Sequence, residues 1–238
     1  MKPDLALIGL GLYTPSEAAT LTGIPGKKIR RWLRGHTIRD TEYPALWTSN
    51  LTSMLDDVES LYLSFLDVVQ LRVADAFIRA GLSAQKVRRA IEYGSEIVRS
   101  DYPFANARFR TDGKTVILHV MSDEPEAGDS AAANERLIDL FKHGQYLMQK
   151  VIEPSLKGLE FDDDDMAARW WPLGRSKGIV IDPRRQFGTP IDDATGVPTS
   201  VLAEAAQAEG SIAQAAKMFM VPQSSVSRAV AFEQQMAA

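Results

Sequence analysis

The sequence predicts a mainly α-helical fold with one small β-hairpin and a helix-turn-helix module near each end of the chain. Three observations support this: a helix-break-helix pattern over residues 14–34, an alternating stretch around an Asp-Gly pair at 112–113, and a series of short alanine-rich helices after residue 200. With 238 residues, the chain can form one large domain or two to three small ones. We expect the divisions 1–95, 96–158, 159–177 and 178–238.

The composition is that of an ordinary globular protein, because 45% of the residues are hydrophobic and 24% are charged, with a formal net charge of −4. The sequence contains no cysteine, which excludes disulfides, thiolate zinc sites and cysteine nucleophiles. No run approaches the roughly 18 apolar residues of a membrane span, and the apolar stretch Leu5–Leu12 lacks a signal-peptide cleavage site. We therefore expect a cytoplasmic protein that does not bind membranes.

Residues 14–17 form a helix-start signal, with Thr14 as N-cap and Glu17 completing a capping box. The first helix should span Pro15–Leu21, and residues 22–25 should break it. Helical periodicity then resumes over Lys27–Arg34, which gives a helix-turn-helix pattern. The inward side of the second helix carries Ile29, Trp32 and Leu33.

The second helix of this pattern is strongly basic. Between Gly26 and Arg39 the chain has six Lys and Arg residues and no acid. One interpretation is a solvated basic face, and the other is a recognition helix that meets the major groove and phosphates of DNA. We predict DNA binding by Lys27, Lys28, Arg30, Arg31 and Arg34.

Residues 13–19, 21–25 and 29–32 resemble the first helices of MerR-type regulators, which carry a winged helix-turn-helix. Later stretches, at 65–71, 80–83 and 87–91, resemble the second helix pair of that domain. The sequence departs from the family in the insert 39–62, which is longer than the usual wing and contains little basic charge. The resemblance covers residues 12–95 and implies operator binding. Helix-turn-helix proteins usually bind paired half-sites, so we expect a homodimer or a larger assembly.

The middle of the chain alternates between apolar and polar residues from Arg108 to Val120, around Asp112-Gly113, which predicts a β-hairpin. An amphipathic helix should follow over 131–153 and end at Pro154. Five acids within residues 160–165 suggest either a calcium-like loop or a solvated linker. Four consecutive aspartates do not provide the alternate ligand spacing of a calcium loop, so we expect a linker and a domain boundary here.

Two adjacent tryptophans, Trp170 and Trp171, follow the acidic stretch. Such a pair either belongs to the hydrophobic core or anchors a protein interface, and the positive charge around it favours the interface. The cations of this candidate interface are Arg175, Lys177, Arg184 and Arg185.

The C-terminal residues predict three helices: an alanine-rich helix over 201–208, a second helix capped by Ser211, and a last helix after residues 221–223. This trihelical module has no basic face, because from Ser200 onward Lys217 and Arg228 are outnumbered by three glutamates. It is therefore either a weak second DNA-binding site or a protein contact. The residues that could bind bases are Gln223, Ser224, Ser225 and Arg228.

Residues 178–236 resemble a short helical domain of unknown function that recurs in antitoxins, through the segments 181–183, 187–190, 196–199 and 226–232. Together with the MerR-like N-terminus, the architecture resembles the larger VapB-type antitoxins. That resemblance implies a type II toxin-antitoxin role, in which the chain neutralises a PIN-like ribonuclease toxin and represses its own operon. The tryptophan pair would then anchor the toxin, and the four cations beside it would neutralise its acidic site. The alternative is a stand-alone MerR-like transcriptional regulator.

Nothing in the sequence predicts an enzyme. The three histidines, His36, His119 and His143, lie in unrelated contexts without a spaced carboxylate or nucleophile. Gly113-Lys114-Thr115 lacks the earlier glycine of a phosphate loop, because Arg108 occupies that position. We expect no catalytic residues, no metal site and no cofactor.

Overall fold

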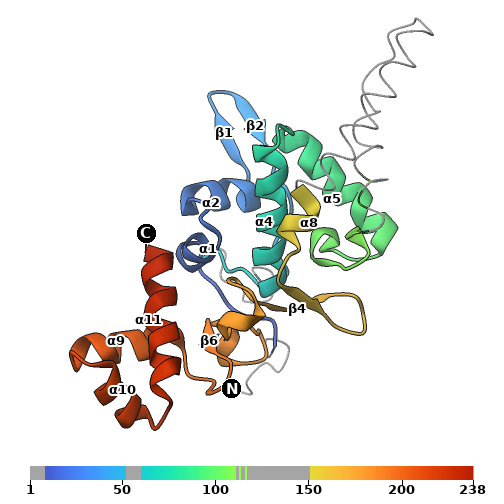
Figure 1. The fold of residues 1–238 in the computed structure, drawn as a ribbon. Helices are drawn as coiled ribbons and strands as arrows, with labels where there is room; N and C mark the ends of the chain where they lie inside the picture. Colours follow the sequence, from blue (N-terminus) through green and yellow to red (C-terminus); the bar gives the residue numbers. More distant parts are fainter. Residues whose placement is uncertain (1–8, 52–59, 111–112, 114–115, 117–150, 238) are drawn as a thin grey trace, which may run out of the picture.

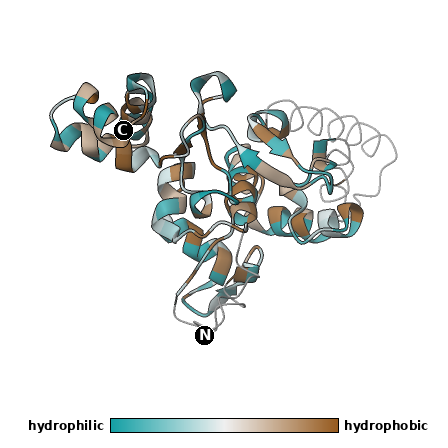
Figure 2. Ribbon diagram, turned by 90° about the horizontal axis from the view of Figure 1, so that it is seen from below, coloured by the Kyte–Doolittle hydropathy of each residue, from teal (hydrophilic) through white to brown (hydrophobic). Residues whose placement is uncertain are grey.

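The computed structural model describes residues 9–51, 60–110, 113, 116 and 151–237 (Figure 1). This part of the chain is mainly helical, and its strands form small two-stranded antiparallel sheets. Figures 1 and 2 show the three C-terminal helices as a lobe at one side of a larger body. None of the described helices has the length and apolar composition needed to span a membrane.

The first two helices lie where the sequence predicts them, with a break between them. Helix α1 spans Pro15–Thr22 with Thr14 and Glu17 in a capping box, and α2 spans Gly26–Arg34. Gly23 ends α1 in the left-handed conformation with φ of 72°, which glycine adopts at little cost. The inward side of α2 is buried as expected, at Ile29, Trp32 and Leu33.

A short β-hairpin follows α2 directly. Strand β1 (His36–Ile38) pairs with β2 (Thr41–Tyr43), and the rings of His36 and Tyr43 stack with centroids 5.0 Å apart. This hairpin lies at the start of the insert and projects from the body beside α2 (Figure 1). It was not predicted, because its side chains are mostly exposed and give no apolar alternation.

The hairpin predicted at Arg108–Val120 is wrong for the residues that the structure describes. Phe109, Arg110, Gly113 and Val116 are helical. The spacing i, i+4, i+7 places Phe109, Gly113 and Val116 on one helix face, and both apolar side chains are fully buried. A Cβ at Gly113 would lie 3.1 Å from Ile152, so the small residue permits a close approach that the alternation concealed.

Helices α4 (Phe65–Arg79) and α5 (Ala84–Val98) form the predicted second helix pair and pack on each other, and α4 also packs on α1. Ser64 and Asp67 cap the start of α4. Asp67 is fully buried and also accepts hydrogen bonds from Trp47 Nε1 (2.8 Å) and Ser49 Oγ (2.7 Å), which attach the segment before α4 to the core.

The acidic stretch does not form a linker. Strands β3 (Leu159–Phe161) and β4 (Ala167–Trp170) pair around it, and the side chain of Asp162 accepts from the backbone N–H of Met166 at 2.9 Å. Leu159, Trp170 and Ile181 belong to the same hydrophobic core as α1, α2 and α4. The expected boundary at residue 159 is therefore wrong, because the main body continues to about residue 181.

Most of the helix expected over 131–153 lies outside the described residues. The described remnant is α8 (Glu153–Ser155), which contains Pro154 instead of ending before it. The described residues also contain single turns of 3-10 helix at η2 (Pro103–Ala105), η4 (Arg175–Lys177) and η5 (Gln186–Gly188).

The C-terminal part begins with β5 (Ile179–Val180) and β6 (Ile191–Asp192), followed by α9 (Thr199–Ala208), α10 (Ile212–Phe219) and α11 (Gln223–Ala237). The three helices contact one another around a separate small core of Leu202, Ala215, Ala216, Val226 and Ala229. Helix α11 also contacts β5, β6 and α1, and Thr199 N at the start of α9 donates to Pro190 O at 2.9 Å, so both helices join this lobe to the body.

Candidate nucleic-acid and partner interfaces

Helix α2 presents an exposed basic face. Lys27, Arg30 and Arg31 are exposed and form no ion pair within the described part of the chain, and Arg34 is exposed beside them. No acidic residue lies on α2, so the positive potential of this face is not neutralised locally. The helix is held on the body by its buried apolar side, which leaves the cations directed at solvent.

Lys28 has a different environment from the other four cations. Its Nζ lies 2.9 Å from Asp75 Oδ1 on α4 and 4.6 Å from the ring centroid of Trp32. Asp75 is buried and also pairs with Arg79 at 2.6 Å. Lys28 therefore fastens α2 to α4, and the exposed cations of α2 are Lys27, Arg30, Arg31 and Arg34.

A groove of about 960 Å³ runs beside this face, between α2, the β1–β2 hairpin and the first turn of α5. It is lined by cations from two helices, with one acid, Glu42, on the hairpin. The lining cations are Lys27, Lys28, Arg31 and Arg88. A concave surface that carries these cations beside an exposed helix suits a phosphate backbone.

The two tryptophans are not an exposed interface. Trp170 and Trp171 are each 5% exposed, because alternate residues at the end of β4 face opposite sides. Trp170 enters the main core, with the Arg72 guanidinium 4.0 Å from its ring centroid, and burial lowers the pKa of Arg72 to about 10. Trp171 packs with Val180 and Ile191. The expectation that this pair anchors a partner is wrong for this structure.

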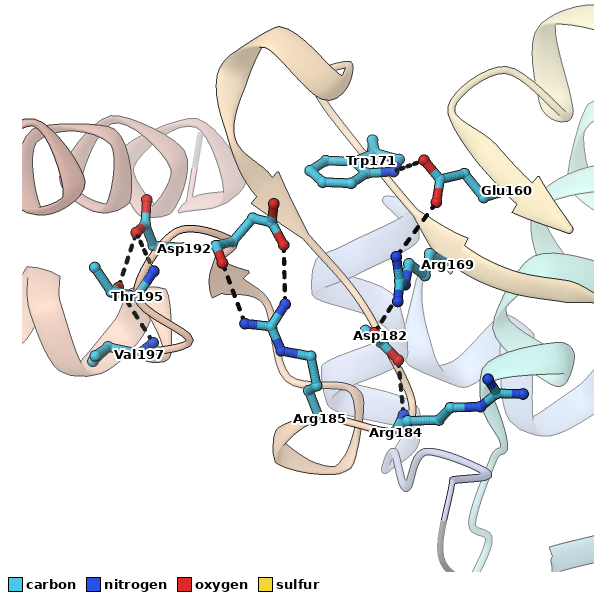
Figure 3. A network of polar contacts seen from close by, with 10 residues as sticks. Glu160, Arg169, Trp171, Asp182, Arg184, Arg185, Asp192, Thr195 and Val197 are labelled. Atoms are coloured by element: carbon cyan, nitrogen blue, oxygen red, sulfur yellow. Dashed lines mark hydrogen bonds and ion pairs between the residues drawn. The ribbon is translucent and has the colours of Figure 1, made fainter. Parts of the chain in front are cut away.

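The four cations expected beside the tryptophans do not form one cluster. Arg175 lies over Trp171 and pairs with Glu160 at 3.2 Å, whereas Arg185 pairs with Asp193 at 2.9 Å. Figure 3 shows Arg185 apart from Arg169, which bridges Glu160 and Asp182. The other two cations, Lys177 and Arg184, are exposed and form no ion pair among the described residues.

Two residues of the expected second DNA-binding set form contacts within the chain. Arg228 Nε donates to Asp192 Oδ1 at 3.0 Å, and its Nη2 lies 3.2 Å from Ser225 Oγ. Ser225 is fully buried, so only Gln223 and Ser224 are exposed at the start of α11. The expectation that Ser225 and Arg228 contact bases is therefore wrong, since both attach α11 to the β5–β6 segment.

Asp192 is the acceptor at the centre of this attachment. Its side chain is fully buried and also accepts from Thr195 N (3.1 Å) and Oγ1 (2.8 Å), as Figure 3 shows. Burial alone would raise the pKa of Asp192, but the hydrogen bonds from Arg228, Thr195 and Ser225 outweigh that effect and hold the pKa below its usual value.

One exposed aromatic residue was not recognised as a candidate. Phe187 is 69% exposed, in a tight turn that follows Arg184 and Arg185. The sequence signals around it, Gly188 and Pro190, indicate a loop but not which side chain the loop exposes.

The fold defined by these elements is shared with a solved protein. The crystal structure of Rv2018 from Mycobacterium tuberculosis superposes with a TM-score of 0.63 at 21% sequence identity, covering 94% of this chain and 99% of that one. In sequence, the chain is 27% identical over 189 residues to a Mycobacterium tuberculosis protein named "Putative antitoxin VapB45", and the match covers 78% of each. No protein-family model matches the chain.

Replacement of Arg228 by Met should destabilise the chain by about 3 kcal/mol, because it leaves a buried carboxylate without its cation. Urea denaturation followed by circular dichroism measures this loss. Lys217→Met, on the exposed face of α10, is the matched control and should change the free energy of unfolding by less than about 0.5 kcal/mol. Equal stability of the two variants would contradict a structural role for Arg228.

Acid should weaken the same attachment. A carboxylate with a lowered pKa stabilises the fold fully above its unfolded value of about 3.9, and this contribution is lost as the pH falls toward the folded value. The free energy of unfolding should therefore decrease below about pH 4 in the wild type and less steeply in Asp192→Asn. Asp67, whose pKa is raised by burial, contributes in both proteins, so the difference between them isolates Asp192. Parallel pH profiles would refute this assignment.

Proposed function

We propose that this chain is a DNA-binding antitoxin of a type II toxin-antitoxin system, without catalytic activity of its own. In this proposal it neutralises a PIN-like ribonuclease toxin and represses its own operon. The observation that carries the proposal is the exposed basic face of α2, in a chain that matches a relative named as an antitoxin over 78% of both lengths. The shared fold with Rv2018 is consistent with it but concerns the fold alone.

The DNA-binding half of the proposal rests on residues 13–98. Helices α1 and α2 would act as a MerR-like helix-turn-helix, with α2 in the major groove and the β1–β2 hairpin in the place of a wing. Arg30, Arg31 and Arg34 would meet the DNA, and the basic groove beside α2 would follow the phosphate backbone. Two copies of the chain would bind the paired half-sites of an operator.

The second half of the proposal, neutralisation of the toxin, depends on the charge of the partner. A PIN-like nuclease gathers carboxylates around a magnesium ion, so a cation from the antitoxin can compete with the metal and add electrostatic complementarity. Lys177 and Arg184 are exposed and would supply such a cation. Arg175 and Arg185 could contribute only after leaving Glu160 and Asp193, which makes them secondary.

The alternative function is a stand-alone transcriptional regulator. The observation in its favour is that the basic face and the adjacent groove lie within one part of the chain and need no partner protein to form. The gene beside this one discriminates the two, because an antitoxin should neighbour a small nuclease with clustered carboxylates.

Replacement of Arg30 or Arg31 by Ala should weaken operator binding, because each change removes a phosphate or base contact. The slope of log K against log salt should also fall by about 0.9 for each lost phosphate contact. Fluorescence anisotropy at several salt concentrations measures both, and Lys217→Ala in the C-terminal lobe provides the control. An unchanged slope in both α2 variants would place the DNA site elsewhere.

Co-purification of the tagged chain from its native cells tests the partner. We expect a stoichiometric small protein with clustered carboxylates, identified by mass spectrometry, whose nuclease activity returns when the chain is removed. Recovery of operator DNA without a protein partner would instead support the stand-alone regulator.

A further inference from the structure

We propose that the loop Pro183–Thr189, here called the anchor loop, is the main contact with the partner protein, with Phe187 as its central residue. The inference rests on the proposed function and deepens it, because it names the surface that binds the nuclease. Phe187 would insert into an apolar pocket beside the acidic site of the partner, and Arg184 would meet the carboxylates of that site.

Exposure of apolar area is the first argument. Phe187 is 69% exposed and Leu12 is 43% exposed, and their backbones are joined because Leu12 N donates to Phe187 O at 3.0 Å. Exposed apolar area of this kind gains free energy when another surface covers it. Aromatic residues with a rim of polar groups are the usual energetic centre of protein interfaces.

The conformation of the anchor loop is the second argument. Gln186 and Phe187 have φ of 47° and 53°, in the left-handed region that residues other than glycine seldom adopt. Such a conformation persists only where its surroundings enforce it, and it is frequent at binding sites. In the anchor loop, this conformation directs the ring of Phe187 outward. The neighbouring Leu12, in contrast, belongs to the segment that leads into the core.

The contacts that enforce this conformation come from the body. The buried Tyr13 donates its hydroxyl to Gly188 O at 2.8 Å, and a Cβ at Gly188 would lie 2.1 Å from Tyr13 Oη. Within the loop, Gly188 N donates to Arg185 O and Thr189 N to Gln186 O, both at 3.0 Å. These contacts fix the backbone that carries Phe187 before the partner binds, which lowers the entropy cost of association.

Charge identifies the partner. Arg184 is exposed three residues before Phe187, and its backbone N–H is fixed by Asp182 Oδ1 at 2.9 Å. The Asp182 carboxylate is itself engaged by Arg169 at 3.0 Å, so it does not neutralise the Arg184 side chain (Figure 3). An exposed aromatic residue beside a cation that has no ion pair among the described residues complements an acidic protein surface and is poorly suited to a basic one.

The test compares Phe187→Ala with Met220→Ala in the full-length chain. Met220 is a matched control, because it is also exposed (92%) and also has a left-handed φ (54°), but it lies in the α10–α11 turn. With the nuclease recovered by co-purification as the probe, we expect Phe187→Ala to weaken binding by about 30-fold, as for an interface hot spot. Met220→Ala should bind as the wild type does, and Arg184→Ala should weaken binding and reduce its salt dependence.

Each outcome is informative. If co-purification with the wild-type chain recovers no nuclease, the proposed function is refuted, whereas binding that Phe187→Ala leaves unchanged refutes the anchor loop alone. Operator affinity and melting temperature of Phe187→Ala should equal those of the wild type, which separates loss of the contact from loss of folding. If Phe187→Ala instead abolishes self-association measured by light scattering, the loop belongs to an interface between copies and the inference is wrong.

Discussion

The buried ion pair between Asp192 and Arg228 determines how the C-terminal helices are attached to the rest of the chain. Helix α11 reaches the β5–β6 segment and α1, and the ion pair lies at this contact. The guanidinium also lies against Gly178, where a Cβ would be 3.2 Å from Nε, so no larger residue fits there without displacing it. A lobe with only a small apolar core depends on such a specific polar contact to fix its orientation.

The N-terminal body uses a second buried carboxylate in a different way. Asp67 has no cation among the partners described for it and instead accepts from Trp47, Ser49 and Ser64. Burial raises its pKa despite these hydrogen bonds, whereas the cation at Asp192 produces the opposite shift. Asp67 attaches a loop to the start of a helix through hydrogen bonds. Asp192 attaches the C-terminal lobe to the body, and its partner there is a cation.

The helices with local signals were predictable from the sequence, and the long-range contacts were not. Thr14 and Glu17 determine the start of α1 within four residues, and the spacing of Ile29, Trp32 and Leu33 identifies the buried side of α2. The burial of Trp170 and Trp171, in contrast, depends on β4 pairing with segments on both of its sides. Likewise, Arg228 resembled a base-reading residue until Asp192, 36 positions away, proved to be its partner. The exposure of Phe187 depends on Tyr13, which is still more distant.

The hydrogen bond between Tyr13 and Gly188 spans 175 residues, and it has a consequence for biosynthesis. Tyr13 directly precedes the N-cap of α1, so the segment that leads into the first helix is completed by a loop near the other end of the chain. During translation, α1 and α2 leave the ribosome long before residue 188 is joined to the chain. The nascent α1–α2 pair therefore lacks one of its buried contacts until about four fifths of the protein has been synthesised. Truncated products that end before this loop cannot form that contact.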